Sequence, residues 1–364
     1  MTTDFTRRDF LVKTGAAAVV AAALPAWAQT DKTVTVAFVG VAHLHTPGYL
    51  NEVAKHANVK VKYVWDHDAA RASRRATEVG ATAVTELKTI WTDAEVAGVI
   101  ILSETNRHAE LVLAAAAAGK NLFVEKPLGI TAAESRQMAA AIQAKKLLFT
   151  TGYFQRIDPK HLFLKGEIAK GNFGKITRVR GSNCHNGALA GWFDTEWRWM
   201  TDPQLAGVGA FGDLGTHKLD ILMWLFGGIA AVTGDIQSVT GRYGSCDETG
   251  EALLRFESGL IGTLAAGWVD VEDPVKLLIS GTAGHALILN EQLFYQSDKR
   301  EDTDNRKPWK MFPPAPPPPL AQFLHSLAGA TNEPLVTAAE AADRVVVMQA
   351  IYEAARTQQW VRVS

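Results

Sequence analysis

The amino-acid sequence predicts an α/β protein with two domains, a doubly wound parallel sheet followed by an α+β domain with a mostly antiparallel open sheet. Up to residue 150, short apolar runs alternate with helical patterns, which is typical of parallel strands joined by helices. From residue 151 on, strand-like runs follow one another, most of them separated by Gly or Pro, as in antiparallel sheets. A chain of 364 residues is long enough to build both cores.

The first domain is predicted at residues 33–150. Its strands are expected at 34–39, 59–65, 82–84, 96–102, 122–124 and 147–150. Helical patterns lie between them. One is an Ala-rich helix that ends at Gly119, a residue suited to the helix C-terminus, and another covers 131–145.

The second domain is predicted at residues 151–364. Helices are expected at 159–171, up to residue 225 and at 337–357, and strands at 175–183, 236–243, 251–257, 260–269 and 276–280. The Pro-rich stretch 311–320 predicts an extended surface segment. The terminal helix could pack back on the first domain.

The first 28 residues have the order of an export signal. Arg7 and Arg8 precede a modest apolar segment, and an A-x-A site ends at Ala28, which resembles a twin-arginine signal peptide. A short amphipathic helix or a membrane anchor is the alternative. The signal predicts a periplasmic protein that meets the twin-arginine export machinery. Because no free pool of nicotinamide cofactor exists outside the cell, such a protein is expected to retain its cofactor tightly.

Composition narrows the function classes. The net charge of −1 leaves no electrostatic footprint for nucleic acid. We expect no metal. Cys184 and Cys246 are interpreted as two unpaired core residues, although an oxidising compartment leaves a disulfide open.

The loop after the first strand carries a degraded dinucleotide fingerprint. Of G-x-G-x-x-G only Gly40 remains, with Ala42 and His45 at the other two glycine positions. An ordinary strand–turn–helix is the alternative. Asp66 ends the second strand 26 residues after Gly40, where a ribose-binding carboxylate belongs, and it favours NAD. Arginines on the next helix, beginning with Arg71, keep NADP possible.

The fifth strand ends in Glu125, Lys126 and Pro127. Ligands of open α/β sheets sit beyond the carboxyl ends of the strands, so this acid and this amine are predicted to face a ligand crevice. The alternative is a solvated surface turn that Pro127 merely ends.

A glycine-rich segment of the second domain holds Asp213 and His217, which are four residues apart and share a helix face. A carboxylate beside an imidazole can orient it and raise its basicity. A helix N-cap and a satisfied core histidine are the alternatives. Upstream, aromatic and polar residues interleave from 192 to 199, which suits a sugar ring or, alternatively, a hydrophobic loop cluster.

Together these motifs resemble the glucose–fructose oxidoreductase / inositol dehydrogenase / rhizopine-catabolism (Gfo/Idh/MocA) family, from about residue 33 to the end of the chain. The strongest matches are E-K-P at 125–127 and D-x-x-x-H at 213–217, and weaker ones lie at 152–156 and 197–203. The resemblance implies a nicotinamide-binding Rossmann domain, and a second domain whose open sheet often forms the interface of a homo-oligomer.

The resemblance also implies roles for single residues. Lys126 would hydrogen-bond the reacting oxygen, His217 would take the hydroxyl proton while hydride leaves for the nicotinamide, and Asp213 would orient His217. Pro127 would follow a cis bond. The expected cofactor contacts are Gly40, Ala42, His45, Asp66, Ser103, His108, Glu125, Lys126 and Pro127. The expected substrate contacts are Arg156, Trp197 and Arg198.

These observations predict an exported NAD(P)-dependent oxidoreductase that transfers hydride between a sugar or polyol and a tightly held nicotinamide. A ping-pong cycle between two sugars fits a retained cofactor. One alternative is an NAD-dependent glycosidase that uses transient oxidation to ease elimination. The other is a non-catalytic sugar-binding protein on the same fold.

Overall fold

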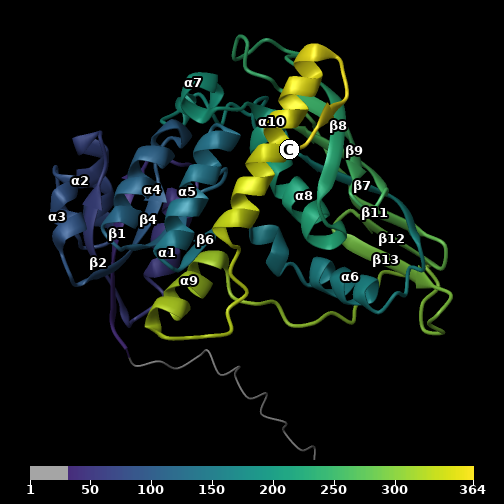
Figure 1. Cartoon of the computed structure of the whole chain (residues 1–364), viewed down its shortest axis with the longest axis horizontal. Coiled ribbons are helices and arrows are strands. Elements are labelled where there is room, and N and C mark those ends of the chain that lie inside the picture. Colours follow the sequence, from purple (N-terminus) through teal and green to yellow (C-terminus); the bar gives the residue numbers. More distant parts are fainter. Residues whose placement is uncertain (1–31) are drawn as a thin grey trace, which may run out of the picture.

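The computed structural model describes residues 32–364, so the proposed signal peptide at 1–28 lies outside the described part of the chain. The described chain has two sheets, with long helices between them (Figure 1). None of its helices is long and apolar enough to cross a membrane.

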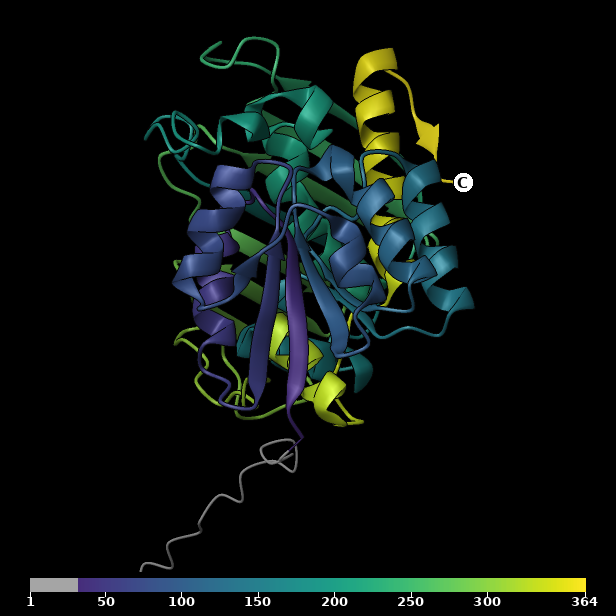
Figure 2. The ribbon, with the colours of Figure 1, turned by 90° about the vertical axis from the view of Figure 1, so that its left-hand side faces the viewer.

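The N-terminal sheet has six parallel strands in the order β3-β2-β1-β4-β5-β6, which is the Rossmann order. Figure 2 shows helices on both sides of its strands. The strands are β1 (Val34–Val41), β2 (Val59–Trp65), β3 (Thr82–Ala83), β4 (Val96–Leu102), β5 (Asn121–Val124) and β6 (Phe149–Thr151). The helices are α1 (Thr46–Val53), α2 (Ala69–Glu78), α3 (Leu87–Thr92), α4 (His108–Ala117) and α5 (Ala132–Ala144). The predicted parallel sheet is therefore confirmed.

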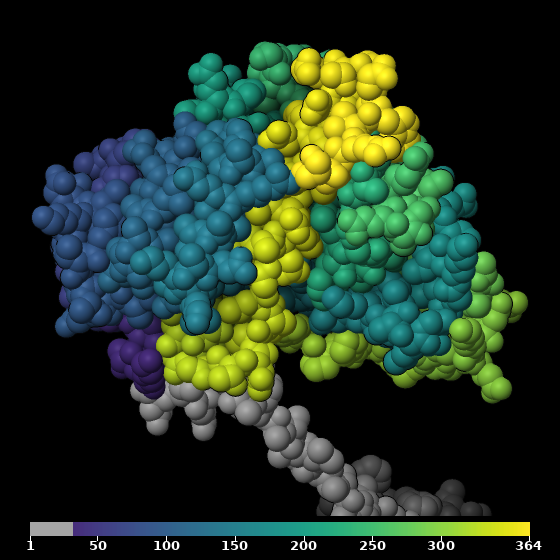
Figure 3. Space-filling view, in the orientation of Figure 1, coloured from purple at the N-terminus to yellow at the C-terminus, as the bar shows by residue number. Residues whose placement is uncertain are grey.

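The end of the chain returns to this sheet. Helix α9 (Pro319–Ala328) buries Phe323 and Leu324 in one core with β1 and β5. Helix α10 (Ala338–Thr357) packs against α5 on one side and against the second sheet on the other, and Figure 3 shows this C-terminal segment wedged between the two sheets. The Pro-rich stretch before α9 is extended, and α9 itself was not predicted.

The second sheet has eight strands in the order β13-β12-β11-β7-β10-β9-β8-β14, antiparallel except where β7 and β10 pair. They are β7 (Ile176–Cys184), β8 (Ile229–Gln237), β9 (Thr249–Phe256), β10 (Ile261–Gly267), β11 (Val275–Gly281), β12 (Gly284–Leu289), β13 (Gln292–Ser297) and β14 (Val361–Arg362). The remaining helices are α6 (Pro159–Ala169), α7 (Pro203–Ala206) and α8 (Ala210–Phe226). Helix α8 lies on the sheet, so the expected mostly antiparallel domain is confirmed.

One predicted strand is wrong in part. The strand expected at 236–243 stops at Gln237, and the following residues form a loop. The reason is Glu248, whose buried carboxylate accepts the backbone N–H groups of Val239 (2.7 Å) and Thr240 and so satisfies them without a neighbouring strand. Both cysteines are free thiols in the structure.

Candidate active site

The turn after β5 is held by a buried histidine. The Nδ1–H of His108 donates to the carbonyl oxygens of Pro127 (3.1 Å) and Leu128 (3.2 Å). The peptide bond between Lys126 and Pro127 is cis, as expected. Glu125 and Lys126 are buried at the carboxyl end of the parallel sheet, which is where ligands bind in this fold.

Lys126 is joined to the second domain by a buried ion pair. Its Nζ lies 2.6 Å from Oδ1 of Asp213, in the first turn of α8, and the indole N–H of Trp268 donates to Oδ2 of Asp213 at 3.2 Å. Burial alone would raise the pKa of Asp213, but the Lys126 ammonium outweighs it and lowers the pKa to about 2. The carboxylate is therefore ionised and fixes the lysine ammonium in place.

His217 lies one helical turn beyond Asp213 and is buried. Its ring packs against Phe154, with 4.7 Å between the ring centroids, and its Nδ1 has no hydrogen-bond partner among residues 32–364. Burial, followed by the charge of Lys126, holds the pKa of His217 well below its usual value. The imidazole is therefore neutral at working pH and can accept a proton.

Asp213 and His217 differ from expectation in one respect. The two oxygens of Asp213 bond Lys126 and Trp268, and the structure has no hydrogen bond from Asp213 to His217. Asp213 thus positions the lysine, whereas the aromatic rings of Tyr153 and Phe154 position the imidazole.

The loop after β1 requires its one glycine. Gly40 has φ +80°, and a Cβ on it would lie 2.5 Å from Cβ of Ser103, so the β1 and β4 ends approach as closely as only glycine permits. The carbonyl of Ala42 accepts the indole N–H of Trp199 (3.2 Å), which seats the loop against the second domain. Nδ1 of His45 faces Oε2 of Glu125 at 3.4 Å.

His43, His45 and Glu125 come close enough for their donor atoms to lie within 4.8 Å of one another. Such a set resembles a metal triad. However, Nδ1 of His43 accepts the backbone N–H of His45 at 3.2 Å, and Nδ1 of His45 faces Glu125, so hydrogen bonds already join the three residues. We therefore interpret the group as a hydrogen-bonded cluster beside Lys126.

Asp66 is buried at the end of β2. It accepts the backbone N–H of Val41 (2.7 Å) and pairs with Arg71 (2.7 Å), and Arg71 also pairs with Glu104 (2.9 Å). A cavity of about 300 Å³ opens beside Asp66 and His67. The tight Gly40 turn, this carboxylate and this cavity fit the adenosine half of a nicotinamide dinucleotide, and Lys126 fits the nicotinamide half.

The three expected substrate residues are not brought to this cluster. The guanidinium of Arg156 pairs with Asp220 (2.6 Å) and Glu340 (2.9 Å), so it ties α8 to α10. Arg198 is exposed and pairs with Asp194. Trp197 is half-buried in the second-domain core, and the tryptophan at the cofactor loop is Trp199.

Several site residues were missed from the sequence. Trp268 directly follows β10 and belongs to no motif, so only the folded structure shows that it contacts Asp213. His43 lies in the loop that begins at Gly40. Its position within the dinucleotide fingerprint could have identified it as a site residue. Glu104 follows β4, and its pairing with Arg71 depends on the β2 and β4 ends meeting.

Both domains of the chain match family models. Residues 34–153 match a model described as oxidoreductase family, NAD-binding Rossmann fold, and residues 161–287 match the GFO/IDH/MocA C-terminal domain. The two matches together cover more than half of the chain. The chain belongs to the Gfo/Idh/MocA family. The predicted NAD-binding Rossmann domain of an oxidoreductase is thereby confirmed.

Named relatives of this Gfo/Idh/MocA protein act on sugars and polyols. Levoglucosan dehydrogenase of Pseudarthrobacter phenanthrenivorans is 29% identical over 220 residues, which cover 54% of this chain and 55% of that protein, about half its length. The scyllo-inositol 2-dehydrogenase (NAD(+)) of Bacillus subtilis is 27% identical over 265 residues, which cover 71% of this chain and 74% of that protein. A solved levoglucosan dehydrogenase in complex with NADH and levoglucosan has a TM-score of 0.78 at 22% identity, covering 91% of this chain and all of that one, a likeness of fold.

Proposed function

We propose that this protein oxidises a secondary hydroxyl group of a sugar or polyol with NAD as the hydride acceptor. The observation that carries the proposal is the buried cluster in which neutral His217 stands beside a Lys126 that Asp213 holds by charge. The names of the relatives, levoglucosan and inositol dehydrogenases, support the same substrate class.

Each side chain has a part in this reaction. The Lys126 ammonium donates a hydrogen bond to the reacting oxygen, which stabilises negative charge as it develops. Neutral His217 accepts the hydroxyl proton at a ring nitrogen. Asp213 and Trp268 keep Lys126 from moving. Bound NAD supplies the hydride acceptor.

NAD is favoured over NADP because two carboxylates, Asp66 and Glu104, flank the single guanidinium of Arg71. A 2′-phosphate would meet both negative charges. Substituting Asp66→Ala should raise the affinity for NADP relative to NAD by about tenfold, a change of roughly 1.4 kcal/mol. Titration of both cofactors followed by protein fluorescence measures the ratio. A ratio unchanged by the substitution would contradict this role of Asp66.

We infer further that the protein is exported through the twin-arginine pathway and works in the periplasm. The support is the Arg7-Arg8 signal and the A-x-A site at Ala28. Fractionation of cells that express the full chain, compared with an Arg7→Lys, Arg8→Lys variant, tests this proposal. Export of the double variant at an unchanged level would refute it.

A homo-oligomer through the second sheet is also proposed. On β10, Ile261, Thr263 and Ala265 alternate with buried residues and so face away from α8, and Ile261 is 52% exposed. Light scattering of the purified protein, with Ile261→Asp as the disrupting variant, tests the proposal. A monomer at micromolar concentration would refute it.

The first experiment is cofactor release. Mature protein is denatured, and the released small molecule is identified by absorbance and mass. We expect stoichiometric NAD(H) and, on adding sugars and polyols, growth of reduced-cofactor absorbance. An empty protein that also fails to bind added NAD would refute the proposal. Release of nitrophenol from a nitrophenyl glycoside with no net reduced cofactor would instead select the glycosidase.

A further inference from the structure

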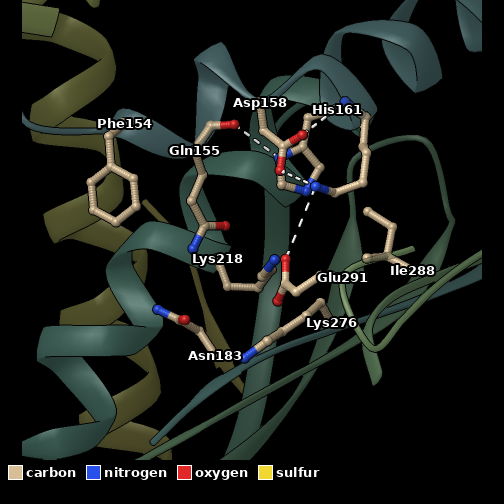
Figure 4. A pocket seen from close by; sticks show the side chains of 10 residues that line it. Phe154, Gln155, Asp158, His161, Asn183, Lys218, Lys276, Ile288 and Glu291 are labelled. Atoms are coloured by element: carbon tan, nitrogen blue, oxygen red, sulfur yellow. Dashed lines mark hydrogen bonds and ion pairs between the residues drawn. The ribbon is translucent and has the colours of Figure 1, made fainter. Parts of the chain in front are cut away.

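A cavity of about 240 Å³ is lined by Phe154 and nine further residues (Figure 4). Its walls come from residues 154–161, from Asn183 of β7, from α8 and from the β11–β12–β13 edge of the second sheet. The lining is polar and includes three lysines, Lys160, Lys218 and Lys276. The reaction proposed above uses none of them.

Lys218 is the one cavity lysine without an ion pair among the described residues. Its side chain crosses over Gly181 of β7, where a Cβ would lie 2.7 Å from Cγ of Lys218, and the residue is 2% exposed. Burial, followed by the charge of Lys276, lowers the pKa of Lys218 to about 8. The ammonium thus stays largely charged at neutral pH while it is withdrawn from water, which is unfavourable unless something pairs with it.

The other charges of the cavity are already matched. Lys160 pairs with Asp158 at 2.9 Å, and Lys276 pairs with Asp273 at 3.0 Å. Glu291 stands at the rim with its side chain 71% exposed, 4.0 Å from Lys160. Lys218 makes no ion pair in the described chain, and the carboxylates of Asp273, Asp158 and Glu291 act on it only from beyond ion-pair distance.

Two buried acceptors also lack partners within residues 32–364. The Nδ1–H of His161 donates to the carbonyl of Gln155 at 2.9 Å, so its buried Nε2 must be an acceptor. No N–H or O–H group of the described chain donates a hydrogen bond to this Nε2. Oε1 of Gln155 is likewise buried and unpartnered. His161 is 4% exposed and lines the cavity. Buried polar atoms are nearly always satisfied, so a ligand with hydroxyl groups would complete them.

A β-bulge turns Lys276 into the cavity. Val275 is opposite Leu289, and Leu277 is opposite Ile288, so β11 advances two residues while β12 advances one. Lys276 and Leu277 therefore both oppose Ile288, which lines the cavity. Bulges that redirect a side chain in this way are frequent beside active sites.

The cavity adjoins the reaction cluster. Phe154 lines it and packs on the ring of His217, and Lys218 directly follows His217 on α8. A substrate whose reacting hydroxyl group lies at His217 can therefore extend past Phe154 toward the Lys218 ammonium.

We propose that this cavity binds the anionic group of an acidic sugar, with Lys218 pairing with a carboxylate or phosphate oxygen and hydroxyl groups donating to His161 and Gln155. The inference rests on the proposed sugar dehydrogenase function and names its substrate class. Carboxylate and phosphate share the required chemistry, so both are included in the test.

The test compares binding of matched neutral and acidic sugars to NADH-loaded protein by titration calorimetry. The probes are D-glucose, D-glucuronate and D-glucose 6-phosphate, with D-galactose and D-galacturonate as a second set. We expect at least one acid to bind tenfold or more tightly than its neutral counterpart at pH 7. The Lys218→Met variant should reduce the preference below threefold, and Lys218→Arg should restore most of it. Lys145→Met, which removes an exposed lysine charge elsewhere, should leave it intact.

Either of two results would overturn the proposal: no acid preferred in the wild type, or a preference that survives in Lys218→Met. Failure of the parent function looks different. A protein that prefers acids but reduces no NAD with any sugar would refute the dehydrogenase and leave the anion site standing. Turnover of neutral sugars without a preference for acids would support the dehydrogenase and refute the anion site.

Discussion

Two lysines of this molecule are equally buried and differ in what faces them. Lys126 meets a carboxylate at 2.6 Å, which is itself held by Trp268. Lys218 has no ion-pair partner in the described chain, and it borders a cavity instead of a packed wall. The Lys126 ammonium is fully paired within the protein, whereas the Lys218 ammonium is available to pair with a bound anion.

The difference separates two uses of buried charge. A paired lysine is preorganised, so it can stabilise a transition state without moving. An unpaired lysine weakens the fold until an anion arrives, so it contributes to affinity and selectivity. The comparison predicts that changes around Lys126 act on turnover and changes around Lys218 act on binding.

The largest effect is expected from His217→Asn, which removes the proton acceptor beside Lys126. The kcat should fall by about 10²- to 10⁴-fold, because general base catalysis is worth that much. Steady-state kinetics on the best sugar substrate, with NAD binding measured in parallel, is the readout. Lys145→Met is the matched control and should keep full activity. A change confined to KM would place His217 with the binding residues and break the comparison.

Next in size is a pair of stability changes of opposite sign. Asp213→Asn leaves the Lys126 ammonium buried and unpaired, so the free energy of unfolding should fall by about 3–5 kcal/mol.

Lys218→Met removes an ammonium whose pKa is lowered from 10.5 to about 8, so the free energy of unfolding at pH 7 should rise by about 1–3 kcal/mol. Urea unfolding measures both. Destabilisation by Lys218→Met would mean that the lysine is satisfied within the protein.

Acidification should weaken the cavity region. Burial, followed by the charge of Lys218, lowers the pKa of His161 from 6.5 to about 4, so the folded state binds this proton less readily than the unfolded state. The stability that results is present above pH 6.5 and is lost as the pH falls toward 4. It should drop by about 2 kcal/mol for this group between pH 7 and 5. His161→Asn should flatten the measured profile, and an unchanged slope would exclude His161 as a source.

The smallest expected effect sharpens the role of Trp268. Trp268→Phe keeps an aromatic ring and removes the hydrogen bond to Asp213, which should lower kcat about three- to tenfold, because the bond acts on Lys126 only through Asp213 and so contributes no more than an ordinary hydrogen bond of about 0.5–1.5 kcal/mol. Binding of the sugar should change less than kcat. An equal loss in affinity would indicate that the indole contacts substrate.

The Rossmann half was predictable almost strand for strand, whereas the second half was not. Parallel strands buried on both faces stand out as apolar runs, and the turns between them carry glycine and polar residues. In the second half, β12 and β13 were missed because both have only six residues and are partly exposed, so their alternating pattern is weak. Residues 238–243 were mistaken for a strand because the buried carboxylate of Glu248 satisfies the amides of Val239 and Thr240 in place of a neighbouring strand.

The candidate site divides in the same way. Lys126, Asp213 and His217 were selected because their two motifs together resemble a known family, and the structure brings them together. Arg156 was chosen from a weak motif, yet Asp220 and Glu340 occupy its guanidinium. Short motifs name the residues that chemistry needs, but they do not say which partner each residue finds.

The sequence alone therefore determined the order of the strands along the Rossmann half of the chain, because hydrophobic periodicity is local, and its motifs identified the reactive groups through their resemblance to a known family. Only the tertiary structure decided that Asp213 holds Lys126 instead of His217, that Trp268 reaches Asp213 and that Lys218 makes no ion pair within the described chain. These facts depend on how segments far apart in the chain pack together. Electrostatic pairing and burial act through space, so the spacing of residues along the sequence does not reveal them.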